Sequence, residues 1–406
     1  MTANASRTIT WGEASARRVE RQFLARPAER GTPVAEVVAA MLGAHAQVLS
    51  AAEVSVGVRA AGVTRGDVRA ALWDDRSLVK TFGPRGTVHL LPAAELPLWC
   101  GALTAIPTGP NALPPDARVT REQAAQIVAA IGDALDGVCL TAEELGEEVV
   151  ARTGPWAGDL VMPAFQGLWP RWRQVLHEAG QSGALCFGPN RGRKVTYTRP
   201  PEFAAGSVPG STPGSARGSG KAALRELVRR YLRAYGPATP RHFARWLAAP
   251  GGWAVELFRE LAEVGEGEGG GGIEEVAFEG GAGWVVAGDT AFPGEGVRGV
   301  RLLPYFDSYV IAAQPRESLF PGEAYRRALA GGQAGNFPVL LVDGVVAGVW
   351  HQRRQGRRTT VTVEPIGRRL TARQERELGE QVERVGEVLE AKAELVVGKV
   401  TVGPHA

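Results

Sequence analysis

Apolar residues recur at spacings of three and four along most of the first 290 residues, which is the period of amphipathic helices. The first such segment, residues 34–42, is predicted to be a helix. A second helix is predicted from Ser50, whose hydroxyl would cap it with Glu53 completing a capping box, and a third over residues 64–75. Two β-rich arms around a Gly-Pro turn then predict a hairpin over residues 77–91. Three helices followed by a hairpin are the order of a winged helix.

The same order of elements is repeated twice further along the chain. The second copy is predicted as helices at 120–135, 141–153 and 163–180, the first two with threonine caps, and a hairpin at 184–200. A Gly/Ser/Pro-rich linker separates it from the third copy. The third copy is predicted as helices at 223–236, 239–249 and 253–265 and a hairpin at 273–288, preceded by a glycine-rich loop. The repetition lies in the order of elements and not in residue identity.

The pattern changes after residue 295, where strands predominate. Strands are predicted at 301–313, 337–350 and 358–366, with a Val-Asp-Gly turn in the second, followed by an amphipathic helix at 370–393 and a last strand. The predicted fold class is therefore α+β, with three winged-helix units and a β-rich closing domain. The predicted domains are 8–105, 118–203 and 222–292 for the winged helices, 204–221 for the linker and 295–406 for the closing domain.

Length and composition narrow the functional classes. A chain of 406 residues with 44 % hydrophobic content can form several domains with ordinary cores. No apolar run reaches the roughly 18 residues of a membrane helix and the N-terminus lacks a signal pattern, so we expect no membrane association and a cytoplasmic location. Cys100, Cys139 and Cys186 are too scattered for a disulfide framework or a zinc site, and we interpret them as small buried hydrophobes.

The net charge of +3 does not by itself identify a nucleic-acid-binding protein, but the arginines are clustered. The planar guanidinium group suits phosphate because it makes bidentate contacts. A charge run can equally be a solvated face, and the abundance of arginine also follows from a GC-rich coding bias. The clustered candidates for DNA contact are Arg171, Arg173, Arg191, Arg193, Lys194, His351, Arg353, Arg354, Arg357 and Arg358.

A polar pair interrupts the small, apolar stretch LGAHAQVLSAAE between the first two predicted helices. His45 and Gln47 stand two residues apart, so an extended backbone would project both to the same side. Such a pair is either aimed at one target or an accident of a helix-to-helix turn. Periodicity alone favours the turn.

Four segments of the chain, in order, carry a resemblance to a known family. They are RGTVHLL (85–91), YGPATPRHFARW (235–246), LLPYFDSYV (302–310) and VDGVVAGVW (342–350). Together they resemble the AlkZ/YcaQ family of bacterial winged-helix DNA glycosylases, over nearly the whole chain. The resemblance implies tandem winged helices and a C-terminal β-rich part that form a C-shaped scaffold gripping damaged duplex DNA.

The resemblance also implies a catalytic pair. The family's signature is Gln-x-Gln, or Gln-x-Asp in the YcaQ branch, after the first helix of the first winged unit. The matching positions here are His45 and Gln47, so the second glutamine is kept and the first is replaced. This His-x-Gln form resembles a variant found in members linked to self-resistance of antibiotic producers, which implies protection against a DNA-alkylating antibiotic.

The chemistry of alkylated purines explains why such a pair is useful. A purine alkylated at N7 or N3 is cationic and a good leaving group, so the enzyme has chiefly to place a water beneath C1′ and stabilise an oxocarbenium-like sugar. We expect His45 to act as the general base or water-orienting group and Gln47 to hold the same water. A Schiff-base step would need an amine nucleophile, so we expect a monofunctional enzyme that leaves an abasic site and uses no cofactor or metal.

Several further residues have two interpretations each. Arg85, Thr87 and His89 are candidates for DNA contact, although Thr87 and His89 can equally pack the wing strand. Asp307 either orients an internal hydrogen-bond network or terminates a strand. The resemblance implies that the basic hairpin bearing His351 lies in or along the minor groove.

The expected partner is duplex DNA that contains alkylated purines, including bulky adducts and interstrand cross-links. We expect the chain to act as a monomer in the cytoplasm, at the nucleoid. The competing interpretation is a winged-helix transcriptional regulator without catalysis, because winged helices most often read promoters. A third is a catalytically inactive protein that binds adducts.

Overall fold

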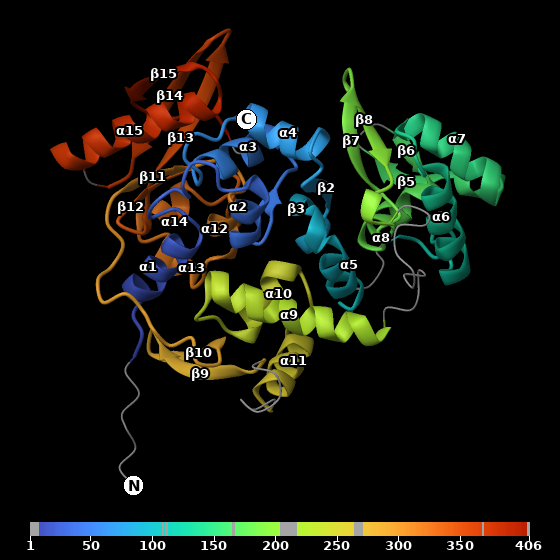
Figure 1. Ribbon diagram of the computed structural model, residues 1–406, viewed down its shortest axis with the longest axis horizontal. Coiled ribbons are helices and arrows are strands. Elements are labelled where there is room, and N and C mark those ends of the chain that lie inside the picture. Colours follow the sequence, from blue (N-terminus) through green and yellow to red (C-terminus); the bar gives the residue numbers. More distant parts are fainter. Residues whose placement is uncertain are drawn as a thin grey trace. The chain divides into compact units, whose positions relative to one another are not determined.

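The structure, a computed structural model, describes residues 8–107, 109, 113–164, 167–203, 217–263, 271–367 and 369–403. The chain divides into two compact units. The first comprises Met1–Asp74, Val228–Leu247 and Gly251–Ala406, and the second comprises Asp75–Leu227 and Ala248–Pro250. Helices and strands both contribute to each unit (Figure 1), so the predicted α+β class is confirmed.

The largest sheet of the first unit has five strands in the order β11-β12-β13-β14-β15. All neighbours are antiparallel except β14 and β15, which are parallel and are joined by helix α15. The tight turn between β12 and β13 uses positive φ at Asp343 (52°) and Gly344 (83°), as the Val-Asp-Gly pattern predicts. The bounds are β11 Val300–Leu303, β12 Val339–Val342, β13 Val345–Gln355, β14 Arg358–Pro365, α15 Ala372–Val388 and β15 Lys392–Val397.

Two apolar clusters bury the two faces of this sheet. One joins the strands to α15 and to helix α3 (Leu49–Gly57) through Trp350, Val361, Val382 and Val54. The other packs Val349 and neighbouring strand residues against three short helices that lie between β11 and β12 in the chain. These helices are α12 Ser308–Ala312, α13 Arg316–Leu319 and α14 Glu323–Arg327.

The N-terminal part of the first unit holds the helices predicted around the His45 segment. Thr64 caps α4, accepting from the backbone N–H of Asp67, as its position predicts. The cap predicted at Ser50 is wrong, because α3 already begins at Leu49 and Val48 occupies the N-cap position. Glu53 is instead buried and pairs with Arg69 at 2.6 Å. The elements are α1 Trp11–Arg21, α2 Val34–Ala40, β1 Ala44–His45, α3 Leu49–Gly57 and α4 Arg65–Trp73.

Helix α1 was not expected, because its buried face is largely polar. Arg18 is 1 % exposed, yet its guanidinium group donates to the carbonyls of Pro237 and Gln314, both at 2.8 Å. Buried charge of this kind is tolerated when hydrogen bonds satisfy it. A search for apolar periodicity therefore overlooks the helix.

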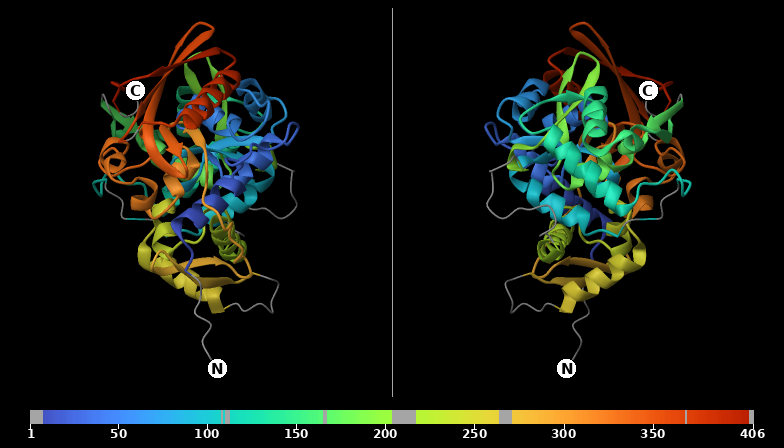
Figure 2. Two further views of the ribbon diagram at one scale, coloured as in Figure 1. Left: turned by 90° about the vertical axis from the view of Figure 1, so that its left-hand side faces the viewer. Right: turned by 90° about the vertical axis from the view of Figure 1, so that its right-hand side faces the viewer.

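The third predicted repeat contains helices α9, α10 and α11 and the hairpin β9–β10. The side views of Figure 2 show this hairpin beside α11. The predicted linker lies outside the described residues, except that residues 217–221 already belong to α9, and residues 265–270 of the predicted glycine-rich loop also lie outside them. The bounds are α9 Arg217–Tyr235, α10 Pro240–Leu247, α11 Gly251–Glu263, β9 Ile273–Phe278 and β10 Gly281–Val286.

Stability at mildly acidic pH should depend on His242, in the first turn of α10. Its Nδ1 accepts from the N–H of Thr239, and burial together with the charges of Arg18 and Arg245 lowers the pKa of His242 to about 4. An unfolded histidine titrates near pH 6.5, so the stabilisation is complete above about 6.5 and is lost as the pH falls towards 4. We expect His242→Gln, which keeps an acceptor but cannot titrate, to flatten the pH dependence of the unfolding midpoint between pH 6.5 and 4.5. Parallel curves for the two proteins would contradict this expectation.

The second unit contains two hairpins that the sequence predicts, β2–β3 and β7–β8. Strand β4 pairs with β8, giving a three-stranded sheet in the order β4-β8-β7. The threonine caps predicted at Thr120 and Thr141 are confirmed, each in a capping box. The bounds are β2 Leu78–Phe82, β3 Val88–Pro92, α5 Leu96–Thr104, α6 Arg121–Ala134, β4 Leu140–Thr141, α7 Ala142–Thr153, β7 Cys186–Arg191 and β8 Lys194–Thr198.

The single helix predicted at 163–180 is wrong in its first half. The chain forms a hairpin, β5 Leu160–Ala164 and β6 Gly167–Pro170, before a 3-10 turn and the short helix α8 Leu176–Gln181. Gly167 has a φ of 107°, and prolines stand within both strands, so a continuous helix is not available to this segment. Helix α5 was not anticipated.

Candidate active site

The turn that leads into His45 has an unusual backbone. Leu42 and Gly43 both have positive φ, 57° and 87°, which reverses the chain after α2 and directs it into β1. Two side chains from distant elements hold this turn: the Tyr235 hydroxyl donates to the Met41 carbonyl at 2.8 Å, and the Ser308 hydroxyl donates to the Gly43 carbonyl at 2.7 Å. The backbone entering the site is therefore fixed at two successive points.

His45 and Gln47 lie in different environments. His45 ends β1 and is only 6 % exposed, and its ring stacks on that of Phe306 with centroids 4.5 Å apart and planes 28° from parallel. Gln47 is exposed and lies in the bend just before α3. The strand ends at His45, so the extended geometry assumed for the pair does not continue to Gln47. The site therefore combines a buried imidazole, stacked on Phe306, with an exposed glutamine two residues later.

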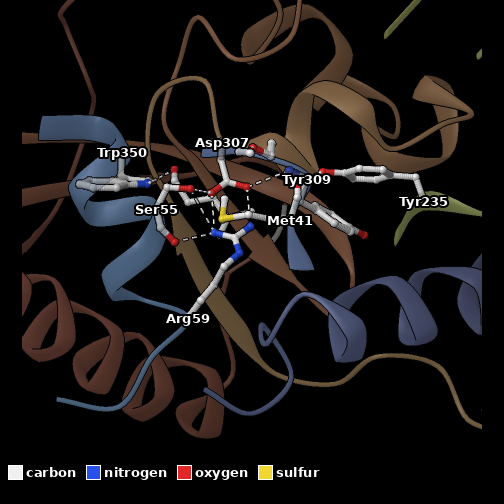
Figure 3. A network of polar contacts seen from close by, with 10 residues as sticks. Met41, Ser55, Arg59, Tyr235, Asp307, Tyr309 and Trp350 are labelled. Atoms are coloured by element: carbon white, nitrogen blue, oxygen red, sulfur yellow. Dashed lines mark hydrogen bonds and ion pairs between the residues drawn. The ribbon is translucent and has the colours of Figure 1, made fainter. Parts of the chain in front are cut away.

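A fully buried ion pair, Arg59–Asp307, lies next to the His45 segment, because Asp307 follows Phe306 in the chain. The Asp307 carboxylate accepts from Arg59 Nη1 and Nη2 at 2.7 and 2.8 Å, and from the Ser55 hydroxyl at 2.5 Å. Figure 3 shows the Arg59 and Ser55 side chains converging on this carboxylate. Both members of the pair are 0 % exposed. Since buried charges are stable only when paired and hydrogen-bonded, this cluster joins α3 rigidly to the segment around residue 307.

The strand predicted over residues 301–313 is wrong beyond residue 303, and the Asp307 carboxylate shows why. Strand β11 ends at Leu303, and Asp307 is the N-cap of α12, accepting from the Tyr309 N–H at 3.0 Å. Asp307 thus belongs to an internal network, one of the two interpretations its sequence left open. The Tyr309 hydroxyl continues the polar contacts to Ser15 at 2.9 Å.

Arg85 and Thr87 lie in the connection between β2 and β3, and His89 lies in β3. Arg85 is half-buried, with a φ of 60°. The Thr87 hydroxyl donates to the Pro84 carbonyl at 3.0 Å, and His89, 4 % exposed, lies with Nδ1 2.9 Å from the Thr87 carbonyl. Thr87 and His89 therefore shape the loop, and DNA contact by any of the three stays a prediction.

The basic residues predicted in the second unit mostly interact within it. Arg171 donates to the Ala117 carbonyl at 2.8 Å, and Arg173 lies 4.4 Å above the Trp169 ring. The remaining three candidates are at the exposed tip of β7–β8: Arg191 pairs with Glu144 at 2.7 Å, Lys194 lies 3.5 Å from Glu143, and Arg193 is exposed.

The β13–β14 hairpin presents the other predicted cluster. Arg353, Arg354, Arg357 and Arg358 are all exposed around its tip, where Gln355 pairs with Arg358. His351, four residues before Gln355, is half-buried, and burial lowers the pKa of its imidazole. The structure thus gathers the C-terminal cations on one projecting hairpin.

Among the described residues, no group of three or more His, Cys, Asp or Glu side chains is arranged to hold a metal ion. Burial raises the pKa of Cys100 and Cys186 to about 12, so both thiols stay protonated, in line with their interpretation as small buried residues. Cys139 departs from this interpretation, because it is only partly buried and its thiol donates to the Thr196 hydroxyl at 3.0 Å. None of the described helices is long and apolar enough to cross a membrane.

Comparison with known proteins identifies the class. The sequence model of the DNA glycosylase AlkZ-like family matches residues 38–388, and the chain belongs to this family. It is therefore a DNA glycosylase, a DNA-repair enzyme that hydrolyses N-glycosyl bonds, and its substrate is DNA. The resemblance drawn from the four sequence segments is confirmed.

Two comparisons point to one characterised relative. The chain is 31 % identical over 350 residues to the interstrand DNA cross-link repair glycosylase of Streptomyces sahachiroi, covering 84 % of this chain and 87 % of that protein. The solved structure of Streptomyces sahachiroi DNA glycosylase AlkZ is similar with a TM-score of 0.72 at 27 % identity, covering 96 % of this chain and 100 % of that one.

Proposed function

We propose that this glycosylase is monofunctional and releases purines alkylated at N7 or N3, including bulky adducts and interstrand cross-links, leaving an abasic site. The observation that carries the proposal is the stacked, nearly buried imidazole of His45 two residues before the exposed amide of Gln47. The relative named as a cross-link repair glycosylase supports the bulky end of this substrate range. Self-resistance to a DNA-alkylating antibiotic, acting as a monomer on nucleoid DNA in the cytoplasm, is part of the same proposal.

In the proposed reaction, His45 and Gln47 divide the work on one water molecule. The alkylated base leaves with its electron pair as a neutral purine, so no acid is needed for departure. As the sugar becomes oxocarbenium-like, His45 accepts a proton from the water that attacks C1′, and Gln47 orients this water through its carbonyl oxygen. General-base assistance of this kind contributes typically about 10²- to 10⁴-fold.

We also propose that the chain is built from tandem winged-helix units with the boundaries predicted above. For the second winged helix, residues 118–203, the element order α6, β4, α7, α8, β7, β8 and the sheet order β4-β8-β7 support this proposal. In the third winged helix, residues 222–292, α9–α11 precede the β9–β10 hairpin, and an isolated bridge joins Ala238 to Trp284 of β10.

The function can be tested with four duplexes: one unmodified, one with a single N7-methylguanine, one with a bulky N7 adduct and one with an N7–N7 cross-link. We expect the free alkylated base by mass spectrometry and a matching alkali-labile site in the modified duplexes only. Tight binding to a specific unmodified sequence without release of any base would support the regulator instead. Release of an unsaturated sugar fragment would overturn the monofunctional assignment.

The exposed arginines of the β13–β14 tip are proposed to contact DNA phosphates. Replacing Arg357 and Arg358 together by glutamine should weaken the salt dependence of binding: the negative slope of log K against log salt should decrease in magnitude by about 2, since each phosphate contact contributes about 0.9. The affinity loss should be similar for damaged and undamaged duplexes, because phosphate contacts carry no sequence information.

A matched control is Arg259→Gln on α11. Arg259 is also exposed, but it is ion-paired to Glu256 and Glu263 on its own helix. We expect this variant to leave the salt slope unchanged. Equal slopes for the hairpin variant and the control would exclude the hairpin from the DNA interface.

A further inference from the structure

Three consecutive residues after β11 contact the His45 segment and the helix that follows it. Phe306 stacks on the His45 ring at a centroid distance of 4.5 Å. Ser308 donates to the Gly43 carbonyl at 2.7 Å, two residues before His45. Between them, Asp307 accepts hydrogen bonds from Ser55 of α3 and from Arg59, which lies two residues beyond the end of this helix; α3 itself begins two residues after Gln47. Residues 306–308 therefore contact the chain at Gly43, just before the His45–Gln47 stretch, at His45 itself, and in the helix that follows Gln47.

The position of the Phe306 ring is set by its backbone. Phe306 has a φ of 55°, a left-handed conformation that non-glycine residues adopt only when their surroundings fix it. Its N–H donates to the Gly335 carbonyl at 2.8 Å. Gly335 has a φ of 93°, and a Cβ built there would lie 3.2 Å from the Cα and Cδ1 of Phe306. The close approach of Gly335 therefore restricts the movement of the Phe306 backbone and ring.

Stacking is a suitable restraint for a catalytic imidazole. A contact through the ring face opposes rotation about the Cβ–Cγ bond, but it does not occupy the ring edge, where both nitrogens lie. The stack, with ring planes 28° from parallel, therefore restrains the orientation of the imidazole through its face.

We propose that Phe306 is a positioning residue for His45, and that Asp307 and Ser308 anchor it to both ends of the catalytic segment. The inference rests on the proposed function, in which His45 orients or deprotonates the attacking water. Phe306 itself touches neither the water nor the sugar in this scheme. Its contribution is to hold the imidazole in one orientation, and small errors of orientation slow a reaction strongly.

The test is a double-mutant cycle measured by single-turnover base release from the N7-methylguanine duplex. Phe306→Leu should slow release on the order of ten- to a hundred-fold, whereas Phe306→Tyr, which keeps the ring face, should stay within about threefold. In the His45→Ala background, Phe306→Leu should add less than about twofold, because the group it positions is gone. Duplex affinity should change less than about twofold throughout.

A second measurement does not depend on activity. The imidazole resonances of His45, assigned by their loss in His45→Gln, are shielded by the Phe306 ring and should move downfield in Phe306→Leu. Ser308→Ala keeps the stack and removes one hydrogen bond, so it covers the case in which Phe306→Leu does not fold. It should slow release in the same direction by a smaller factor, and this effect should also vanish without His45.

Equal slowing by Phe306→Leu in both backgrounds would overturn the positioning role, because it would show a general structural effect. Unchanged His45 resonances and an unchanged rate in Phe306→Leu would overturn it as well. Normal base release by His45→Ala would instead defeat the proposed function. In that case the shift of the His45 resonances still decides whether Phe306 orients the ring.

Discussion

Replacing His45 by alanine is expected to slow single-turnover release of an N7-alkylated purine by about 10²- to 10⁴-fold, the usual range for general-base assistance. Binding of the same duplex should be nearly unchanged, because the imidazole is 6 % exposed and offers little contact surface to DNA. The measurement is base release with enzyme in excess over duplex, alongside a fluorescence titration of DNA binding. Near-normal release would remove His45 from the reaction.

The substitution His45→Gln distinguishes general-base catalysis by His45 from simple orientation of the water. His45→Gln restores the Gln-x-Gln pair, which can orient water through an amide but cannot take up its proton. If His45 is a base, the wild-type rate should fall on acidification, since a protonated imidazole has no acceptor nitrogen, and His45→Gln should be slower with a flat pH profile. Equal rates and equal pH profiles would leave His45 the role of orienting water only. Gln47→Ala should also slow release, because the exposed amide is the second group proposed to hold the water.

Local signals in the sequence predicted much of the fold. Thr64, Thr120 and Thr141 each cap a helix and each exchange hydrogen bonds with a polar residue three positions on, which is a short-range interaction. The turn at Asp343 and Gly344 is similarly local, since positive φ is intrinsic to these residue types. Such elements form as the pattern predicts because nothing distant has to change them.

Two of the elements that the sequence did not predict correctly are determined by contacts with distant residues. Ser50 carries a capping sequence, but Glu53 is drawn into the core by Arg69, and α3 begins one residue earlier. Helix α1 is stabilised by arginine contacts to carbonyls more than 200 residues away, for which apolar periodicity gives no signal.

The candidate site was predicted only in part for the same reason. The sequence pointed to His45 and Gln47 through their family position, but gave no sign that Phe306 lies on the imidazole. These two rings are 261 positions apart, and no periodic pattern connects them. The available clue was Asp307, a carboxylate within an apolar run, since a charge in such a run must either end the element or find a buried partner.

Asp307→Asn is expected to destabilise the first unit by about 3–5 kcal/mol, a large part of the roughly 5–15 kcal/mol that stabilises an ordinary domain. Asparagine is still a good N-cap for α12, so the change chiefly removes the negative charge. It leaves the guanidinium group of Arg59 unpaired where both side chains are 0 % exposed. Urea unfolding, with the midpoint and the m-value both compared with wild type, measures the loss.

Two comparisons make the cause of this loss specific. The same carboxylate-to-amide change at Glu387, 65 % exposed and paired with Arg384, should cost less than about 1 kcal/mol, as surface pairs do. Adding Arg59→Met to Asp307→Asn should recover part of the stability, because the unpaired buried charge is then removed. A loss at Asp307 no larger than that at Glu387 would contradict the assignment. Because Asp307 joins Phe306 and Ser308 to α3, Asp307→Asn should also slow base release at temperatures where the protein remains folded.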